Sequence, residues 1–530
     1  MARERRIIFW GVILLLCRIY VFMPVLAETA LKKNAQTPLV ESFIALNGNR
    51  VDSYEGGKKI QIAKPEQYTG MTGVLTFRSG PIRNNASAGT VSVDSEELKV
   101  MRGFRTSRLE ELSGYGFGSQ ALLVKWFKNV RDIMNIEEKY RNGTAMKEVI
   151  VPSRDGQIYF FDLNAMEPSR APISVGVPMS VTASINPYGF PLLYVGQSAE
   201  EVGEYTVNTG MRVYSLLDQK RLFFQTSLST VSEGDRNEVF SSPIIDTASD
   251  TVIYTDANGM LYLLPMNTVF DMEAGTVEVL PQTLTYGYVT QARWKDVTLA
   301  GSASVYSRYA YFADLSGVLQ CVDMTTMKCM WSRNLSDSVI AAMPLERDGK
   351  ALYLYVGTVV NKTGRSRAIT LYKLNASNGE VIWEYTTEHP AKYLSKPAEE
   401  GLYAGLMASP ILGEGDISDV VIFNVNRLET EEGKYTAVLF ALDRETGELV
   451  WETPLNAESV SSPTAMYTEE GRCYIVVGDE EGFFHLIDGG YGNPLDSVFL
   501  GSSVQASPAA YGNRIVVGTK GGVLYFIDLQ

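Results

Sequence analysis

A repeated apolar segment constrains this chain more than any other feature. Stretches of the type "GVLYFIDL" occur eight times, and aligning them on the residue that ends each apolar run gives Asp162, Leu217, Pro265, Asp323, Asn375, Asp443, Asp488 and Asp528. The copies are roughly 40 to 70 residues apart, which is the length of a propeller blade with loops of variable size. A unit of this size cannot bury a core alone, so the repeat predicts a ring or stack of similar units.

Each copy contains the parts of a four-stranded antiparallel sheet. The aligned run is apolar at nearly every position, as in a strand covered on both faces. A glycine turn such as Glu480-Glu481-Gly482 joins it to a preceding β-rich strand. A small-small-proline element such as Ser461-Ser462-Pro463 marks the first strand of the unit. The sequence therefore predicts an all-β fold, an eight-bladed β-propeller with four antiparallel strands per blade; seven blades are the alternative.

The last copy ends after its third strand, at Gln530. An unpaired edge at that point would expose backbone hydrogen-bonding groups. Residues 88–106 form a β-rich stretch ahead of the first copy, and its "LKVMRGF" has the pattern of the missing fourth strand. We expect residues 88–106 to pair with the last copy and to close the ring non-covalently.

Several residues recur at fixed places in the repeat. Trp331, Trp383 and Trp451 end the fourth strand of their copies, and Gly379 and Gly447 each lie four residues before a tryptophan. Their fixed place predicts packing between blades rather than ligand stacking. The aspartates that end the third strands are interpreted in the same way, as structural positions of the repeat: Asp162, Asp323, Asp443, Asp488 and Asp528.

These motifs resemble the pyrroloquinoline-quinone-like (PQQ-like) propeller repeat of quinoprotein dehydrogenases and of outer-membrane assembly lipoproteins of the BamB type. "TAVLFALDRETGELVWET" and "ITLYKLNASNGEVIWEY" carry the pattern, and "TFRSGPIRNNA" (76–86) resembles the segment that opens the first blade. The resemblance covers residues 70–530 and implies the fold. It implies less about function, because the same fold carries unrelated roles.

This chain departs from the enzymes of the family. Dehydrogenases with this repeat use a vicinal Cys-Cys ring, an aspartate base and Glu/Asn ligands for calcium, and no Cys-Cys pair occurs here. We therefore assign no catalytic, cofactor-binding or metal-binding residue, and we expect no cofactor. The chain also has only two histidines, far apart, which disfavours a histidine-based metal site.

Cys321 and Cys329 lie on one expected hairpin. If Met324-Thr325-Thr326 forms the turn, the two residues lie opposite each other, and a cross-strand disulfide is compatible with that geometry. Cys321 also occupies an apolar column of the repeat, so a buried thiol is the other interpretation. Either role is structural.

The N-terminus has the layout of a secretory signal peptide over residues 1–27: a basic start, the apolar run "IIFWGVILLL", and small residues before Glu28. An uncleaved membrane anchor is the alternative. Residues 28–69 are lower in apolar content and are interpreted as a linker or stalk. The propeller then spans residues 70–530, and "KWFKNVRDIMNIEEKYRNG" (125–143) predicts a helix inserted in the first blade.

The net charge of −14 argues against nucleic acid and anionic membranes as partners. We expect a secreted or envelope-located, non-catalytic monomer with no membrane span after leader cleavage, which binds a protein, peptide or glycan through its rim loops. An envelope-assembly scaffold of the BamB type is one alternative. A quinoprotein-like dehydrogenase is another.

Overall fold

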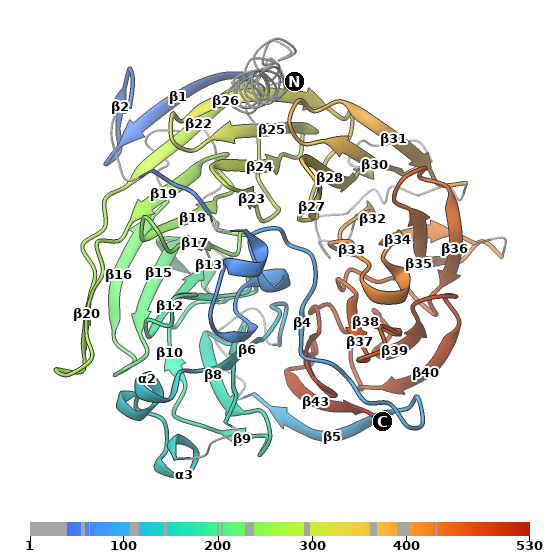
Figure 1. The fold of residues 1–530 in the computed structure, drawn as a ribbon, viewed down its shortest axis with the longest axis horizontal. Coiled ribbons are helices and arrows are strands. Elements are labelled where there is room, and N and C mark those ends of the chain that lie inside the picture. Colours follow the sequence, from blue (N-terminus) through green and yellow to red (C-terminus); the bar gives the residue numbers. More distant parts are fainter. Residues whose placement is uncertain are drawn as a thin grey trace, which may run out of the picture.

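The protein is a ring of eight small antiparallel sheets, seen along the ring axis in the computed structural model (Figure 1). The structure describes residues 40–54, 59–62, 64–106, 116–142, 146–198, 201–202, 205–227, 238–290, 297–360, 368–388, 403–430 and 432–530. The predicted leader, residues 1–27, and the first part of the predicted linker lie outside these ranges. The predicted eight-bladed β-propeller is confirmed.

Each blade runs from an inner strand to an outer strand. Blade 1 consists of β6 (Leu122–Lys125), β7 (Glu148–Pro152), β8 (Gln157–Asp162) and β10 (Ile173–Ser174), with β3 (Thr72–Val74) inside and β9 (Glu167–Pro168) outside. Blade 2 consists of β11 (Ser184–Ile185), β12 (Leu192–Gly196), β15 (Gly210–Ser215) and β16 (Arg221–Thr226), and blade 3 of β17 (Ile244–Asp246), β18 (Thr251–Thr255), β19 (Leu261–Pro265) and β22 (Leu284–Thr290). Blade 4 consists of β23 (Ser304–Tyr306), β24 (Tyr309–Ala313), β25 (Val318–Asp323) and β26 (Lys328–Asn334).

Blades 5 to 8 repeat this order. Blade 5 consists of β27 (Leu345–Asp348), β28 (Ala351–Gly357), β30 (Thr370–Asn375) and β31 (Val381–Thr386), and blade 6 of β33 (Ile411–Leu412), β34 (Val420–Glu429), β35 (Tyr435–Asp443) and β36 (Leu449–Pro454). Blade 7 consists of β37 (Thr464–Tyr467), β38 (Cys473–Gly478), β39 (Phe483–Asp488) and β40 (Pro494–Phe499). Blade 8 consists of β41 (Ala509–Tyr511), β42 (Arg514–Gly518), β43 (Val523–Leu529) and β5 (Leu98–Arg105).

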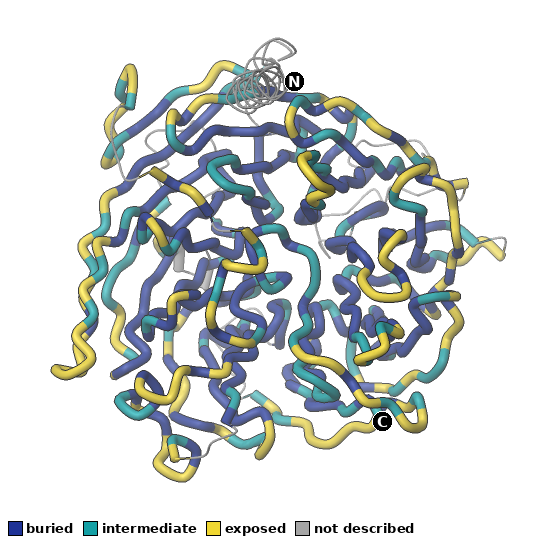
Figure 2. Tube along the Cα trace, in the orientation of Figure 1, coloured by how far each residue is buried: buried dark blue, intermediate teal, exposed yellow. Residues whose placement is uncertain are grey.

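Smaller elements decorate the ring. They are β1 (Val40–Leu46), β2 (Asn49–Val51), β4 (Ser87–Ala88), β13 (Glu201–Val202), β14 (Tyr205–Thr206), β20 (Val269–Asp271), β21 (Thr276–Glu278), β29 (Val359–Val360), β32 (Ala404–Gly405), helices α2 (Lys128–Ile133) and α3 (Glu138–Arg141), and 3-10 turns η1 (Pro65–Gln67), η2 (Phe77–Ser79) and η5 (Gly415–Ile417). Most residues of the third strands are buried, and exposed residues gather at the outer edge and in the connections (Figure 2).

The ring closes as the sequence predicts. β5 pairs antiparallel with β43, from Val523 opposite Arg105 to Leu529 opposite Leu98. β5 is thus the fourth strand of blade 8, although it precedes blade 1 in the chain. This pairing satisfies the backbone groups that the end of the chain would leave exposed.

The predicted linker is wrong for the described part of residues 28–69. β1 pairs with β22 and extends blade 3 outward, with the Phe43 ring lying over Gly287. Ile60, Ile62 and Tyr68 are also buried against blades 3 and 4. The apolar residues of "VESFIAL" are few when averaged over the whole stretch, but they suffice to cover the outer edge of a blade.

The predicted single helix over 125–143 is two short helices instead. Between α2 and α3 the backbone is extended: Asn135 N–H donates to the carbonyl of Leu217, and Glu137 N–H to that of Ser169. These contacts with the neighbouring chain replace the hydrogen bonds that would continue α2. Val130, Met134 and Tyr140 are buried, so the segment packs on the ring.

Candidate functional site

The ring axis is filled by residues 75–88, which we call the axial segment. Figure 1 shows this blue part of the chain at the centre of the ring. It contacts the inner strands of blades 2 to 8 in order, through these hydrogen bonds: Ile185 N–H to Leu75 O, Thr76 Oγ1 to Pro243 O, Val305 N–H to Pro81 O, Leu345 N–H to Ile82 O, Leu412 N–H to Asn84 Oδ1, Ala465 N–H to Asn85 Oδ1 and Ala510 N–H to Ala86 O. The axial segment therefore satisfies the inner edges of seven blades.

Two buried arginines fasten the axial segment. Arg78 donates to the carbonyls of Pro463 at 2.5 Å, Asn84 at 2.7 Å and Pro410 at 3.2 Å. Both prolines belong to small-small-proline elements, so this motif presents carbonyl acceptors toward the axis. Burial lowers the pKa of the Arg78 guanidinium to about 9, which leaves it charged at neutral pH.

Arg83 makes the equivalent contacts on the other side of the axis. It donates to the carbonyls of Ser242 at 2.6 Å, Phe77 at 2.9 Å and Ala303 at 3.0 Å. Both arginines have left-handed backbones, with φ of 56° and 57°. The resemblance singles out "TFRSGPIRNNA" but not these roles, because the acceptors in the blades lie 159 to 385 residues away in the chain. The only hint of these roles in the sequence is that two arginines occur in a short stretch that is otherwise uncharged.

Above the axial segment lies a small pocket of about 170 Å³, to which every blade contributes. Phe77 and Gln120 line it together with serines from several blades, such as Ser242, Ser409 and Ser462. The quinone and calcium that the dehydrogenase members imply do not fit here. The volume is below the roughly 300 Å³ of the smallest usual ligand pockets, and among the described residues the lining offers no carboxylate.

The repeat tryptophans lie between blades. Trp331 donates from Nε1 to the carbonyl of Ala376 in blade 5, and Trp383 to that of Arg444 in blade 6. Each ring lies on the glycine turn of the next blade. A Cβ on Gly379 would come within 2.7 Å of the Trp331 ring, and one on Gly447 within 2.6 Å of the Trp383 ring. Trp451 packs in the same way on the backbone of Gly492 in blade 7.

The repeat aspartates organise the turns that follow the third strands. Asp443 Oδ1 accepts hydrogen bonds from the backbone N–H groups of Glu445 and Thr446, and four of the five aspartates accept backbone N–H groups in this way: Asp162, Asp323, Asp443 and Asp488. Asp528 has no following turn and instead pairs with Arg514. These positions build the propeller and do not converge on a common site.

The cysteines are not joined. Both thiols are free, and a register shift places Cys321 opposite Trp331 and Cys329 opposite Val322. The turn between the strands holds four residues rather than the three assumed for the disulfide, because Asp323 pairs with Lys328. A one-residue change of register moves a side chain to the other face. Cys321 therefore packs toward blade 5 and Cys329 toward blade 3.

A buried histidine also has a structural explanation. His485 Nε2 lies 2.9 Å from Asp479 Oδ2, at the turn before the third strand of blade 7. In blade 1 the hydroxyl of Tyr159 donates to Asp155, and in blade 3 that of Tyr262 donates to Asp256. His485 therefore takes the place of a repeat tyrosine. Among the described residues no group of three His, Cys, Asp or Glu side chains is arranged to hold a metal ion.

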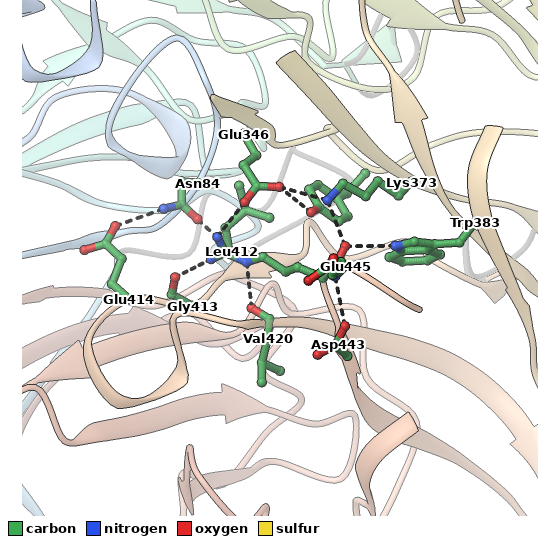
Figure 3. A network of polar contacts seen from close by, with 12 residues as sticks. Asn84, Glu346, Lys373, Trp383, Leu412, Gly413, Glu414, Val420, Asp443 and Glu445 are labelled. Carbon is green, nitrogen blue, oxygen red and sulfur yellow. Dashed lines mark hydrogen bonds and ion pairs between the residues drawn. The ribbon is translucent and has the colours of Figure 1, made fainter. Parts of the chain in front are cut away.

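A charged cluster joins blades 5 and 6 (Figure 3). Glu346 lies 2.9 Å from Arg444 and 3.4 Å from Lys373, and it accepts a hydrogen bond from Tyr355 at 2.5 Å. Burial opposes ionisation of Glu346, but the Tyr355 hydrogen bond and the charges of Arg444 and Lys373 outweigh it and hold its pKa below the ordinary value. Arg444 also donates to the carbonyl of Gly413. The cluster satisfies its own charges and fastens one blade to the next.

A different part of the rim exposes apolar side chains. Phe127 precedes α2, Tyr188 and Phe190 lie between β11 and β12, and Phe270 and Met272 belong to the β20–β21 hairpin. We call these five residues the aromatic rim surface. Ring centroids of Tyr188 and Phe190 are 5.7 Å apart, and those of Phe190 and Phe270 are 5.5 Å apart.

The aromatic rim surface is continuous and partly open to solvent. Phe127 lies against the backbone of Gly189, and Asn129 Nδ2 lies 3.3 Å from Met272 Sδ. Tyr188 is 67% exposed, Phe127 40% and Met272 37%. Three blades contribute to it, on one side of the ring in Figure 1. Sequence reasoning did not find this surface because its residues are widely separated in the chain.

Fold and site together define a propeller with a filled axis, side-chain pairs that hold neighbouring blades together, and an exposed apolar rim. The family model described as outer membrane protein assembly factor BamB matches residues 287–417 and 426–530. This match covers a little under half of the chain and is consistent with the PQQ-like propeller repeat that the sequence resembles. No curated protein sequence matches it.

Three solved structures are similar to this chain. BamB from Moraxella catarrhalis is 14% identical, with 81% of this chain and 97% of that chain covered and a TM-score of 0.47. The computationally designed protein Ika8 is 10% identical, with coverage of 84% and 99% and a TM-score of 0.44. Quinohemoprotein alcohol dehydrogenase from Comamonas testosteroni is 11% identical, with coverage of 86% and 80% and a TM-score of 0.53. At these identities the likeness concerns the fold.

The described part of the chain contains no helix with the length and apolar character needed to span a membrane.

Proposed function

We propose that this protein is an extracytoplasmic, non-catalytic propeller that binds a partner protein through its aromatic rim surface. The observation that carries the proposal is the continuous exposure of Phe127, Tyr188 and Met272 beside Phe190 and Phe270. Contiguous exposed apolar patches mark protein interaction sites, and aromatic residues and methionine are enriched there. The leader-like N-terminus supports a location outside the cytoplasm.

Two further features support a binding role. The three segments of the aromatic rim surface are insertions or connections of the rim, where binding residues are commonly carried by a rigid scaffold. The axial pocket is small and uncharged in the described residues, which agrees with a non-catalytic role. The match to the BamB family model favours a partner in envelope assembly as the more specific form of the proposal.

Site-specific photo-crosslinking in the native envelope tests the proposal. A benzophenone side chain is placed at Tyr188 or Met272, and matched controls carry it at Tyr491 or Phe499 of blade 7, which are exposed apolar residues outside the surface. We expect a discrete adduct with one protein from the first pair only. Equal adducts from all four positions would refute the assignment.

An assay for quinone-dependent catalysis tests the non-catalytic part of the proposal. The purified chain is supplied with the quinone, calcium and a redox dye in the presence of an alcohol. We expect no dye reduction above that of a heat-denatured sample. Saturable dye reduction would show that the protein is an enzyme and would overturn the non-catalytic part of the proposal.

A further inference from the structure

A groove of about 1,050 Å³ lies between blade 6 and blades 7 and 8. Its walls are the β34–β35 hairpin, residues 454–458 before β37, and the turns that follow β38 and β42. These connections lie at the opposite strand ends from those of the aromatic rim surface, because strand direction alternates within a blade. The groove is therefore a separate site, and an inference about it does not rest on the proposed function.

A long hairpin shapes the groove. β34 and β35 span 10 and 9 residues, whereas β38 and β39, their counterparts in blade 7, span 6 each. The register shifts between Val425 and Leu428, where Arg427 has a φ of 58°, and such a bulge bends a hairpin. Thr436 Oγ1 donates to the carbonyl of Leu455 at 2.6 Å and fixes the bent end. The wall of the groove is thus held in place by the fold itself.

Carboxylates outnumber cations along the groove. Six glutamates line it together with three basic residues: Glu429, Glu432, Glu452, Glu458, Glu480 and Glu481, with Arg427, Lys434 and Lys520. Arg427 pairs with Glu458 at 2.9 Å and Lys434 with Glu432 at 3.2 Å. The excess of negative charge in a concave site concentrates cationic ligands.

Glu480 has an unfilled contact in the groove. Its Oε2 accepts hydrogen bonds from Ser503 Oγ at 2.7 Å and Gln505 Nε2 at 3.3 Å. Its Oε1 is buried and has no hydrogen-bond partner among the described residues. Burial raises the pKa of Glu480, because its charged form is poorly solvated. An ammonium or guanidinium group of a ligand would supply the missing donor.

The groove also has an apolar side. Leu428, Val438 and Leu455 line it and are buried to more than nine-tenths in the free protein. A ligand that fills the groove therefore carries both cationic and apolar groups. The volume of about 1,050 Å³ lies just above the roughly 300 to 1,000 Å³ of small-molecule pockets, which favours several residues of an extended chain.

We propose that the groove of blades 6 to 8 binds an extended peptide segment of a partner protein in which lysine or arginine alternates with apolar residues. The cationic side chains contact Glu429, Glu480 and Glu481. The apolar side chains lie on the Leu428 and Leu455 side of the groove.

Fluorescence anisotropy with the full chain tests this proposal. The probe is a fluorescein-labelled heptapeptide, Gly-Lys-Leu-Lys-Leu-Lys-Gly, compared with its analogue in which each lysine is glutamate. We expect saturable binding of the lysine peptide alone, weaker at higher salt. Replacing Glu429, Glu480 and Glu481 by glutamine weakens that binding about tenfold. A matched triple variant with glutamine at Glu380, Glu445 and Glu448, which are exposed at the opposite strand ends, changes it less than twofold.

One variant changes the affinity in the opposite direction, so that misfolding cannot imitate the result. Lys520→Gln removes an exposed cation from the groove and strengthens lysine-peptide binding about twofold. Equal weakening by the groove and control triple variants would show that only the net charge of the protein acts, and it would overturn the site. Displacement of the heptapeptide by an equal concentration of spermidine would identify a site for small polycations and would overturn the peptide assignment.

Discussion

The attachment of the axial segment provides the most direct test of how this ring is held together. Arg78→Met removes three donors from a buried site, those to Pro463, Asn84 and Pro410. Each hydrogen bond from a charged group contributes about 1.5 to 3 kcal/mol. The buried guanidinium itself costs several kcal/mol in lost hydration, which the uncharged methionine avoids. The net loss in the free energy of unfolding is therefore about 3 to 5 kcal/mol.

Urea-induced unfolding followed by tryptophan fluorescence measures this loss, with the slope against urea used to check that the transition is unchanged. Arg347→Met is the matched control, because Arg347 is exposed on β27 and its Nε donates only to the carbonyl of Gly349. We expect a change below about 0.5 kcal/mol there. Arg78→Lys keeps the charge but reaches fewer carbonyls, so its stability lies between the two. Equal stabilities of Arg78→Met and Arg347→Met would refute the role of the axial segment.

Three further predictions follow from named contacts. Burial raises the pKa of Asp256 from 3.8 to about 7, so between these two pH values the folded form keeps the proton and the unfolded form loses it. The free energy of unfolding therefore falls by about 4 kcal/mol as pH rises from 4 to 8, and Asp256→Asn removes this part of the pH dependence. Urea unfolding measures it, and parallel pH profiles of the wild type and Asp256→Asn would contradict the prediction. Gly379→Ala lowers the free energy of unfolding by about 2 to 4 kcal/mol, because the new Cβ meets the Trp331 ring. Gly349→Ala, also at positive φ but with no atom within 4 Å of the new Cβ, lowers it by about 1 kcal/mol. Equal urea midpoints of the two variants would rule out the clash with Trp331 as the cause. Deletion of residues 88–106 abolishes cooperative melting, because blade 8 loses its outer strand and the axial segment loses its last residue, Ala88. A retained calorimetric transition would disprove non-covalent closure.

Repetition explains why the fold could be predicted so far. An apolar third strand buried on both faces, a glycine turn and a tryptophan strand are local patterns, and eight copies reinforce one another. The fourth strand missing after Asp528 can also be predicted from the sequence, because an unpaired edge requires a partner and "LKVMRGF" matches the repeat. By contrast, the hairpin of Cys321 and Cys329 was predicted one residue out of register, since the length of its turn depends on Met327 adopting a φ of 53°.

The sequence by itself determined the blade and the strand that closes the ring and favoured eight blades over seven, because these depend on contacts within a repeat or on an edge that must be paired. Tertiary structure decided the rest. Arg78 reaches carbonyls of blades 6 and 7, β1 covers blade 3, and Phe127, Tyr188 and Phe270 meet from three different blades. Closing the ring brings residues hundreds of positions apart to one axis and one rim. No local pattern records those distances, so the candidate binding surfaces became visible only in the folded molecule.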